Sequence, residues 1–133
     1  MTASASRGRR GERASAALEL ALVLPLVLTM TLAVVQVGLL VKDQLVVADA
    51  ARAGARQASV STDDGSVRQA VEQAATGLSS GRLSVSISRS GSVGTPVTVQ
   101  VTYRAPIAVP VVTWLFPSEV RLTTSATMRQ ETS

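Results

Sequence analysis

The sequence contains no cysteine and no histidine among its 133 residues. Without cysteine, the chain can form neither a disulfide bond nor a thiolate metal site. Without histidine, it lacks the side chain that most often binds metals and acts as a general base near neutral pH. No serine stands in a G-x-S-x-G context, and the acidic pair Asp63–Asp64 falls in a turn-like segment without the other ligands of a calcium loop. The composition therefore predicts a protein that is not an enzyme and holds no metal ion or cofactor.

Aromatic residues are almost absent, with one Trp, one Tyr and one Phe. The net charge of +4 is concentrated in a short leader that carries Arg7, Arg9, Arg10 and Arg13. Nucleic-acid binding typically uses a basic stripe on a folded face, often with aromatic side chains for stacking. No aromatic residue lies near these arginines, so we expect no nucleic-acid partner.

The longest feature is an apolar run. Leu20 to Val41 are 22 residues without a charge, and a helix that spans a bilayer needs about 20 mostly apolar residues. A secretory signal has a shorter apolar region, of about 7–15 residues. The small-x-small sequence at Ala48–Ala50 leaves a cleaved signal as the alternative to an anchor. The arginines before the run predict that the N-terminus stays in the cytoplasm and that the C-terminal part lies outside it.

Three segments are therefore expected: a basic, disordered leader over residues 1–14, a transmembrane helix over residues 15–41, and an extracytoplasmic domain over residues 42–133. The helix should continue to Val60, because the segment after Lys42 is rich in alanine and free of proline. The small residues Ala50, Gly54 and Ala58 form a row that allows close helix packing, either against the chain's own sheet or against a neighbouring subunit. Asp49 and Arg52 are spaced for an ion pair.

The domain is predicted to be α+β. Residues 66–78 form an amphipathic pattern with a capping box at Ser66 and Gln69 and a stop at Gly77. Period-two alternation predicts antiparallel strands over residues 82–88, 97–103 and 119–128, with a turn between the first two. Residues 104–117 should form a proline-rich crossover that covers one end of the core. In it, Trp114 and Phe116 are either core residues or a belt at the membrane surface.

Two residues in the apolar helix are unusual. A carboxylate inside a membrane is costly, so Glu19 either reaches back to the headgroups or has a specific role. Pro25 removes one helix hydrogen bond and is expected to bend the helix. Prolines also occur in membrane helices without a special purpose, so the residues alone leave both questions open.

This arrangement resembles the type IV prepilins and pseudopilins. More narrowly, "SAALELALVLPLVL" followed by "QVGLLVKDQLVVADAARAGARQASV" resembles the TadE-like minor pilins of the bacterial tight-adherence (Flp) pilus system. The resemblance covers roughly residues 10–60, and the C-terminal domain is pilin-like in outline only.

The resemblance implies a set of roles. A prepilin peptidase would cut between Ala14 and Ser15, where the family favours glycine before the cut, and Glu19 would become the fifth residue of the mature chain. The new N-terminal amine can be methylated, and Glu19 would pair with the amine of a neighbouring subunit during assembly. The implied partners are the peptidase, other pilins, the inner-membrane assembly platform with its cytoplasmic ATPase, and the lipid bilayer.

Two functions are consistent with the sequence. The first is a minor pilin or pseudopilin in the bacterial cytoplasmic membrane, with possible incorporation in a pilus. The second is a single-pass, membrane-anchored extracytoplasmic binding module, in which the helix is only a tether. In the second case a foreign anchor could replace residues 15–41 without loss of function.

Overall fold

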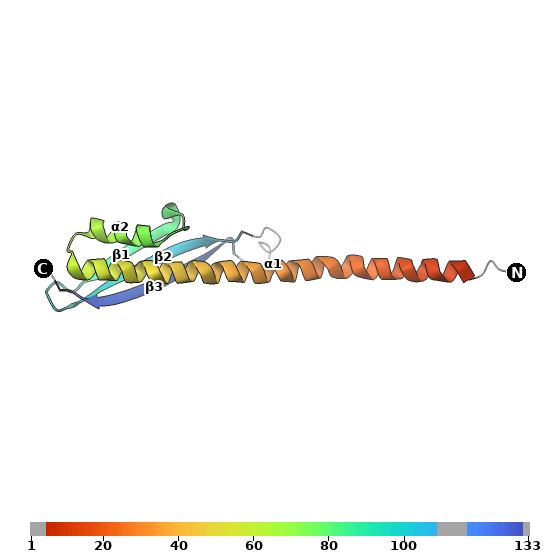
Figure 1. The fold of residues 1–133 in the computed structure, drawn as a ribbon, viewed down its shortest axis with the longest axis horizontal. Coiled ribbons are helices and arrows are strands. Elements are labelled where there is room, and N and C mark those ends of the chain that lie inside the picture. Colours follow the sequence, from red (N-terminus) through yellow and green to blue (C-terminus); the bar gives the residue numbers. More distant parts are fainter. Residues whose placement is uncertain (1–4, 109–116, 132–133) are drawn as a thin grey trace.

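One helix dominates the structure. The computed structural model describes residues 5–108 and 117–131, with side chains described from Gly11 onward. Helix α1 runs from Ala5 to Val60, an unbroken 56 residues, which spans about 84 Å at a rise of 1.5 Å per residue. Its N-terminal half extends as a bare rod, and its C-terminal half lies within the folded domain (Figure 1).

The start of α1 corrects the sequence prediction. Residues 5–14 are helical, so the expectation of a disordered leader is wrong for this segment. Alanine, arginine and glutamate are good helix formers, and extending an existing helix costs much less than nucleating a new one. The side chains of Arg7, Arg9 and Arg10 lie outside the described part of the chain, whereas Arg13 is exposed on the helix.

Helix α2, Asp64–Ala74, begins earlier and ends earlier than predicted. Its N-cap is Asp63, whose carboxylate accepts hydrogen bonds from the backbone N–H groups of Gly65 (3.1 Å) and Ser66 (2.9 Å). The predicted capping box at Ser66 and Gln69 is therefore wrong. The segment STDDGS contains several good capping residues, and Asp63 takes the position because its carboxylate satisfies two free donors. Gly77 has a positive φ of 82° and lies in the turn after the helix.

Three strands form an antiparallel meander in the order β1-β2-β3, as the alternation predicts. They are β1 (Leu83–Arg89), β2 (Pro96–Pro106) and β3 (Glu119–Arg129). Strand β2 is longer than expected, because Arg104 to Pro106 pair with β3 instead of starting the crossover. The two prolines of this central strand stand at its ends, where a missing N–H is tolerated. Trp114 and Phe116 lie outside the described residues.

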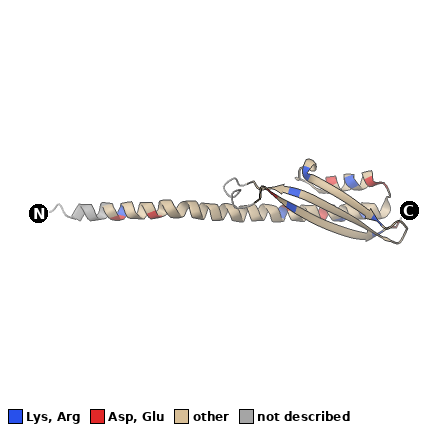
Figure 2. Ribbon diagram, turned by 180° about the vertical axis from the view of Figure 1, so that it is seen from behind, with Lys and Arg blue, Asp and Glu red and all other residues tan. Residues whose placement is uncertain are grey.

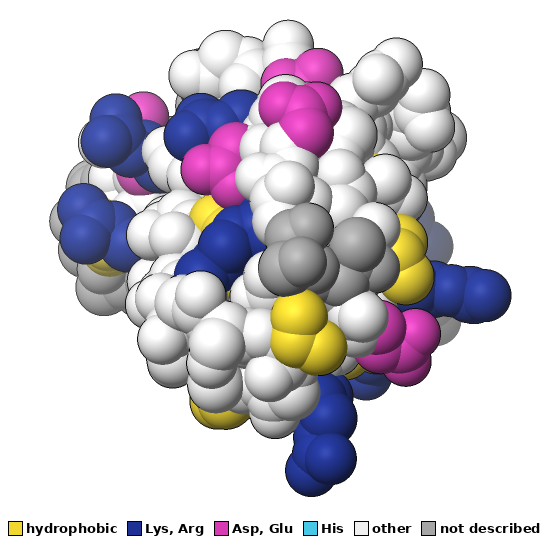
Figure 3. Space-filling view, turned by 90° about the vertical axis from the view of Figure 1, so that its left-hand side faces the viewer, with side chains coloured by type: hydrophobic (Ala, Val, Ile, Leu, Met, Phe, Trp, Pro, Cys, Tyr) yellow, Lys and Arg dark blue, Asp and Glu magenta, His cyan; other side chains and the backbone are white. Residues whose placement is uncertain are grey.

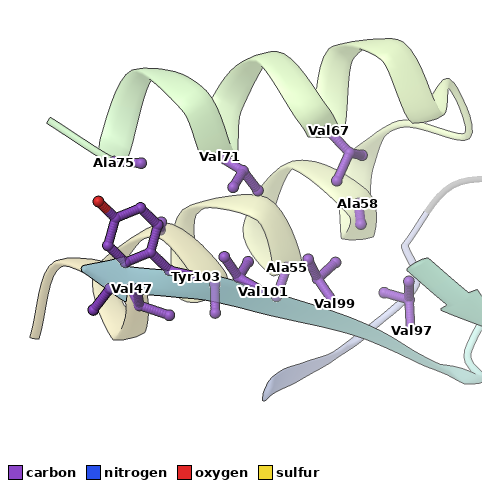
Figure 4. Packing of buried hydrophobic residues seen from close by; sticks show 13 residues of the cluster. Val47, Ala55, Ala58, Val67, Val71, Ala75, Val97, Val99, Val101 and Tyr103 are labelled. Carbon is purple, nitrogen blue, oxygen red and sulfur yellow. The ribbon is translucent and has the colours of Figure 1, made fainter. Parts of the chain in front are cut away.

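Both helices cover one face of the sheet. Helix α1 contacts β2 and β3, while α2 packs on α1 and reaches β1. The core consists of alanine and valine side chains with one tyrosine, which meet between the helices and β2 (Figure 4): Val47, Ala50, Ala51, Ala55, Ala58, Val67, Val71, Ala75, Val97, Val99, Val101, Tyr103 and Ala105. The opposite face of the sheet is exposed and carries mainly serine, threonine and arginine. The predicted α+β layers, with the C-terminal half of the long helix on the sheet, are confirmed.

Candidate functional site

The N-terminal half of α1 is an uncovered apolar surface. Its most apolar 18-residue window has a mean hydropathy of 2.4, and only 6% of that window is buried. The exposed side chains include many large ones: Leu18, Leu20, Leu22, Val23, Leu24, Leu26, Val27, Leu28, Met30, Val34, Val35 and Val37. The core helix of a water-soluble protein would be mostly buried, and contiguous apolar surface of this extent marks a membrane or protein contact. Helix α1 is therefore a candidate membrane span.

Two threonine hydroxyls in this half of the helix are satisfied by the helix backbone itself. The hydroxyl of Thr29 donates to the carbonyl oxygen of Pro25 (2.8 Å), and that of Thr31 donates to Val27 (2.9 Å). Hydrocarbon offers no hydrogen-bond partners, so internal bonds of this kind suit a membrane helix. Helix α1 passes Pro25 without interruption, and Figure 1 shows it continuing as one rod, without the bend that the sequence predicts.

Glu19 lies on this bare rod. Its side chain is exposed, and within residues 11–108 and 117–131 it forms no ion pair or side-chain hydrogen bond. Ala14 and Ser15, the residues at the predicted peptidase cut, are exposed one turn before it in the same helix. The carboxylate is thus free to meet a partner outside the chain, and the two residues that flank the predicted cut are exposed.

The folded domain meets α1 inside the uncharged run. Gln36 is buried, and its side-chain oxygen accepts a hydrogen bond from the backbone N–H of Ala108 (3.0 Å). Farther along, Gln44 donates to the hydroxyl of Thr124 in β3 (2.9 Å). Packing against the domain therefore starts before Lys42, where the sequence places the domain boundary.

The row of small residues is used within the chain. Ala50 and Ala58 are fully buried, and a Cβ on Gly54 would lie 2.5 Å from Cγ2 of Val71 and 3.0 Å from Cγ1 of Val99. The row therefore lets α1 approach α2 and β2 of its own domain, the first of the two predicted alternatives. Val47 and Ala50 belong to the same core, so cleavage after Ala50 would remove both from it.

Arg89 is a structural residue that the sequence prediction missed. Its guanidinium donates to the carbonyl oxygens of Ala58 (3.3 Å) and Ser61 (3.0 Å) at the end of α1, and it pairs with Asp64 at the start of α2 (2.8 Å). Only 18% of the side chain is exposed. One signal was available: Arg89 continues the inward-facing series of β1 after Ile87, so a charge at this position needs a partner.

The other ion pairs of the described residues lie at the surface. Arg52 and Asp49 make the predicted ion pair at 2.8 Å, but both side chains are exposed, so the pair contributes little stability. No group of three or more acidic residues in the described part of the chain could hold a metal ion. Figure 3, which looks onto the end of the domain far from the bare helix, shows both signs of charge interspersed with little hydrophobic surface. Among the described residues, most of the exposed large hydrophobic side chains lie on α1.

One comparison with known proteins finds a match, and it falls on this helix. A family model described as TadE-like protein matches residues 14–56. This range holds most of the bare half of α1, including Glu19, and most of its buried half. This match agrees with the resemblance drawn from the sequence, and the matched segment is similar to TadE-like proteins. Neither the comparison with curated proteins nor that with solved structures finds a match.

Proposed function

We propose that the protein is a minor pilin or pseudopilin of the tight-adherence (Flp) pilus system. Helix α1 holds it in the bacterial cytoplasmic membrane with the α+β domain outside the cytoplasm, and a prepilin peptidase cuts between Ala14 and Ser15. The observation that carries the proposal is the uncovered apolar rod in a TadE-like segment. Such a rod needs lipid before assembly and neighbouring helices after it, which is what a pilin helix requires.

Glu19 sets the axial position of each subunit relative to its neighbour during assembly. After cleavage, the new amine at Ser15 carries a positive charge, and the carboxylate of Glu19 on a neighbouring subunit can pair with it. In a low-dielectric helix bundle each charge offsets part of the desolvation of the other, and removing one partner costs about 3–5 kcal/mol. A pair of this kind penalises wrong axial positions more than it adds stability.

The test is Glu19→Gln in a host that assembles the pilus. Membrane insertion should be unchanged, because the substitution removes a charge from an apolar helix, and incorporation into pili should fall strongly. Glu12→Gln is the matched control, since Glu12 lies before the cut and is absent from the mature chain. Normal incorporation of the Glu19→Gln protein into pili would refute the proposed role of Glu19 in assembly.

The tethered binding module remains the second candidate, because the core is complete within the domain and the buried half of α1. Replacing residues 15–35 by an unrelated membrane helix separates the two functions. These residues precede Gln36, so the exchange keeps the hydrogen bond between Gln36 and Ala108 and every core residue of α1 from Val47 onward. A pilin should lose function in this exchange, whereas a tethered module should keep it.

A further inference from the structure

Basic residues gather at the end of the sheet from which the bare helix emerges (Figure 2). Arg104 of β2 lies directly opposite Arg121 of β3, and both are exposed on the outer face of the sheet. Arg82 is exposed just before the pair Leu83–Tyr103, at the same end of the sheet. Like charges directly opposite each other on a sheet are destabilising, so the position of Arg104 and Arg121 calls for an anionic partner.

No acidic side chain among the described residues forms an ion pair with these arginines. In the part of the chain whose side chains are described, Arg82, Arg104 and Arg121 form no ion pair and no side-chain hydrogen bond. The two opposed arginines and Glu119 line a pocket of about 390 Å³. The pocket has a net positive charge and is open to an anion from outside.

The height of this pocket along α1 follows from two hydrogen bonds. Gln44 is hydrogen-bonded to Thr124 of β3, which lies opposite Val101 of β2. Gln36 is hydrogen-bonded to Ala108, just beyond the end of β2. Arg104 and Arg121 lie between these two hydrogen bonds along the strands. They are therefore level with the segment of α1 from Gln36 to Gln44. The uncharged run ends within that segment, at Val41.

The bilayer surface falls at the same height. If the hydrocarbon begins at Leu20, a core of about 30 Å at 1.5 Å per residue ends close to Leu40. The headgroup layer then surrounds the last residues before Lys42, whose side chain is exposed and 3.9 Å from Asp43. The arginine pocket therefore opens into the layer that holds the lipid phosphates.

We propose that Arg104 and Arg121 dock the sheet on the membrane by binding the headgroup phosphates of anionic phospholipids. Guanidinium groups bind phosphate oxygens with two parallel hydrogen bonds, and one phosphate between the two arginines removes their mutual repulsion. Glu119 can accept a hydrogen bond from a headgroup hydroxyl, as in phosphatidylglycerol. The contact fixes the tilt of the domain before assembly. It rests on α1 as a membrane span and holds whether or not the chain enters a pilus.

The test uses the full chain in vesicles. The sequence has no cysteine, so Ser84→Cys on the exposed face of β1 carries a unique fluorophore, in the row of Thr102. Its quenching by headgroup-labelled lipid is compared in phosphatidylcholine and in phosphatidylcholine mixed with phosphatidylglycerol. We expect stronger quenching with phosphatidylglycerol and loss of this increase at high salt.

The decisive variant is Arg104→Gln/Arg121→Gln. Each basic side chain near an anionic surface contributes about 1 kcal/mol, or about fivefold, so the double variant should shift the docked equilibrium about 30-fold toward the detached domain. Arg129→Gln is the matched control, because Arg129 lies on the same face of β3 at its far end, opposite Pro96, and should change nothing. Circular dichroism checks that each variant is folded.

Three results would overturn the inference. Quenching that does not depend on phosphatidylglycerol would exclude binding of its headgroup. If Arg129→Gln lowers the quenching as much as the double variant does, the attraction comes from the overall positive charge of the domain and not from the Arg104–Arg121 pocket. Quenching that rises with the protein-to-lipid ratio would assign the arginines to a contact between protein copies. Failure of the chain to float with vesicles would instead remove the membrane span, and with it both this inference and the proposed function.

Discussion

Gly54→Ala tests the close packing of α1 against its own domain. An alanine Cβ at this position would lie 2.5 Å from Cγ2 of Val71 and 3.0 Å from Cγ1 of Val99. Both valines are fully buried, so neither can turn away into solvent. Overpacking of this kind costs about 1–3 kcal/mol, and the upper part of this range applies because one contact is below 3.0 Å.

The same substitution has a favourable part. Alanine is better than glycine in a helix interior by about 1 kcal/mol. The net effect should therefore be a loss of about 1–2 kcal/mol, equivalent to about 5–10 °C in the melting temperature of a domain of this size. The assay is thermal unfolding of the full chain in detergent, followed by circular dichroism.

Gly38→Ala is the matched control on the same helix. A Cβ at Gly38 meets no atom within 4 Å, so only the helix-propensity gain applies, and the melting temperature should stay equal or rise. A second check combines Gly54→Ala with Val71→Ala, which removes the closest methyl group. The two changes should cost less together than the sum of their separate costs. If Gly54→Ala is as stable as the wild type, the close approach of α1 to α2 is refuted.

Three further predictions concern single side chains, each measured by denaturant unfolding in detergent. Arg89→Met should cost about 2–3 kcal/mol, because it leaves two carbonyl groups without their charged donor, whereas exposed Arg68→Met should change stability by less than about 0.5 kcal/mol. Asp63→Ala should cost about 1 kcal/mol through loss of the α2 N-cap, and Asp63→Asn should recover most of it; equal losses in both would exclude the cap. Arg52→Ala should cost at most about 0.5 kcal/mol, since its ion pair with Asp49 is exposed, and a larger loss would show a contact beyond that pair.

The strands and the apolar half of α1 follow from local patterns. Apolar and polar residues alternate along β1, β2 and β3, which indicates that each strand has one buried face. The pattern is contained within each segment, so the three strands could be predicted. The end of β2 could not, because Arg104 to Pro106 become strand only through pairing with Arg121, Val120 and Glu119 far along the chain. A local pattern does not contain that pairing.

Some residues of the site could likewise be predicted from the local sequence, whereas the partners of others depend on the tertiary fold. The exposed carboxylate of Glu19 in an apolar helix is visible in the sequence, since its cost is local. The spacing of Ala50, Gly54 and Ala58 predicts a close helix contact but cannot name the partner, which is fixed by Val71 and Val99 in other elements. The link from Arg89 to the ends of both helices likewise depends on the tertiary fold.

The most direct test of the proposed function is the mass of the mature protein, purified from membranes of the native host. A chain that begins at Ser15, with or without one added methyl group, is the predicted result, and it makes Glu19 the fifth residue. A chain that begins near Met1 would contradict the proposal, because Glu19 would then have no new amine on a neighbouring subunit to pair with. A chain that begins at Ala51 would instead identify a cleaved signal and remove the membrane span altogether.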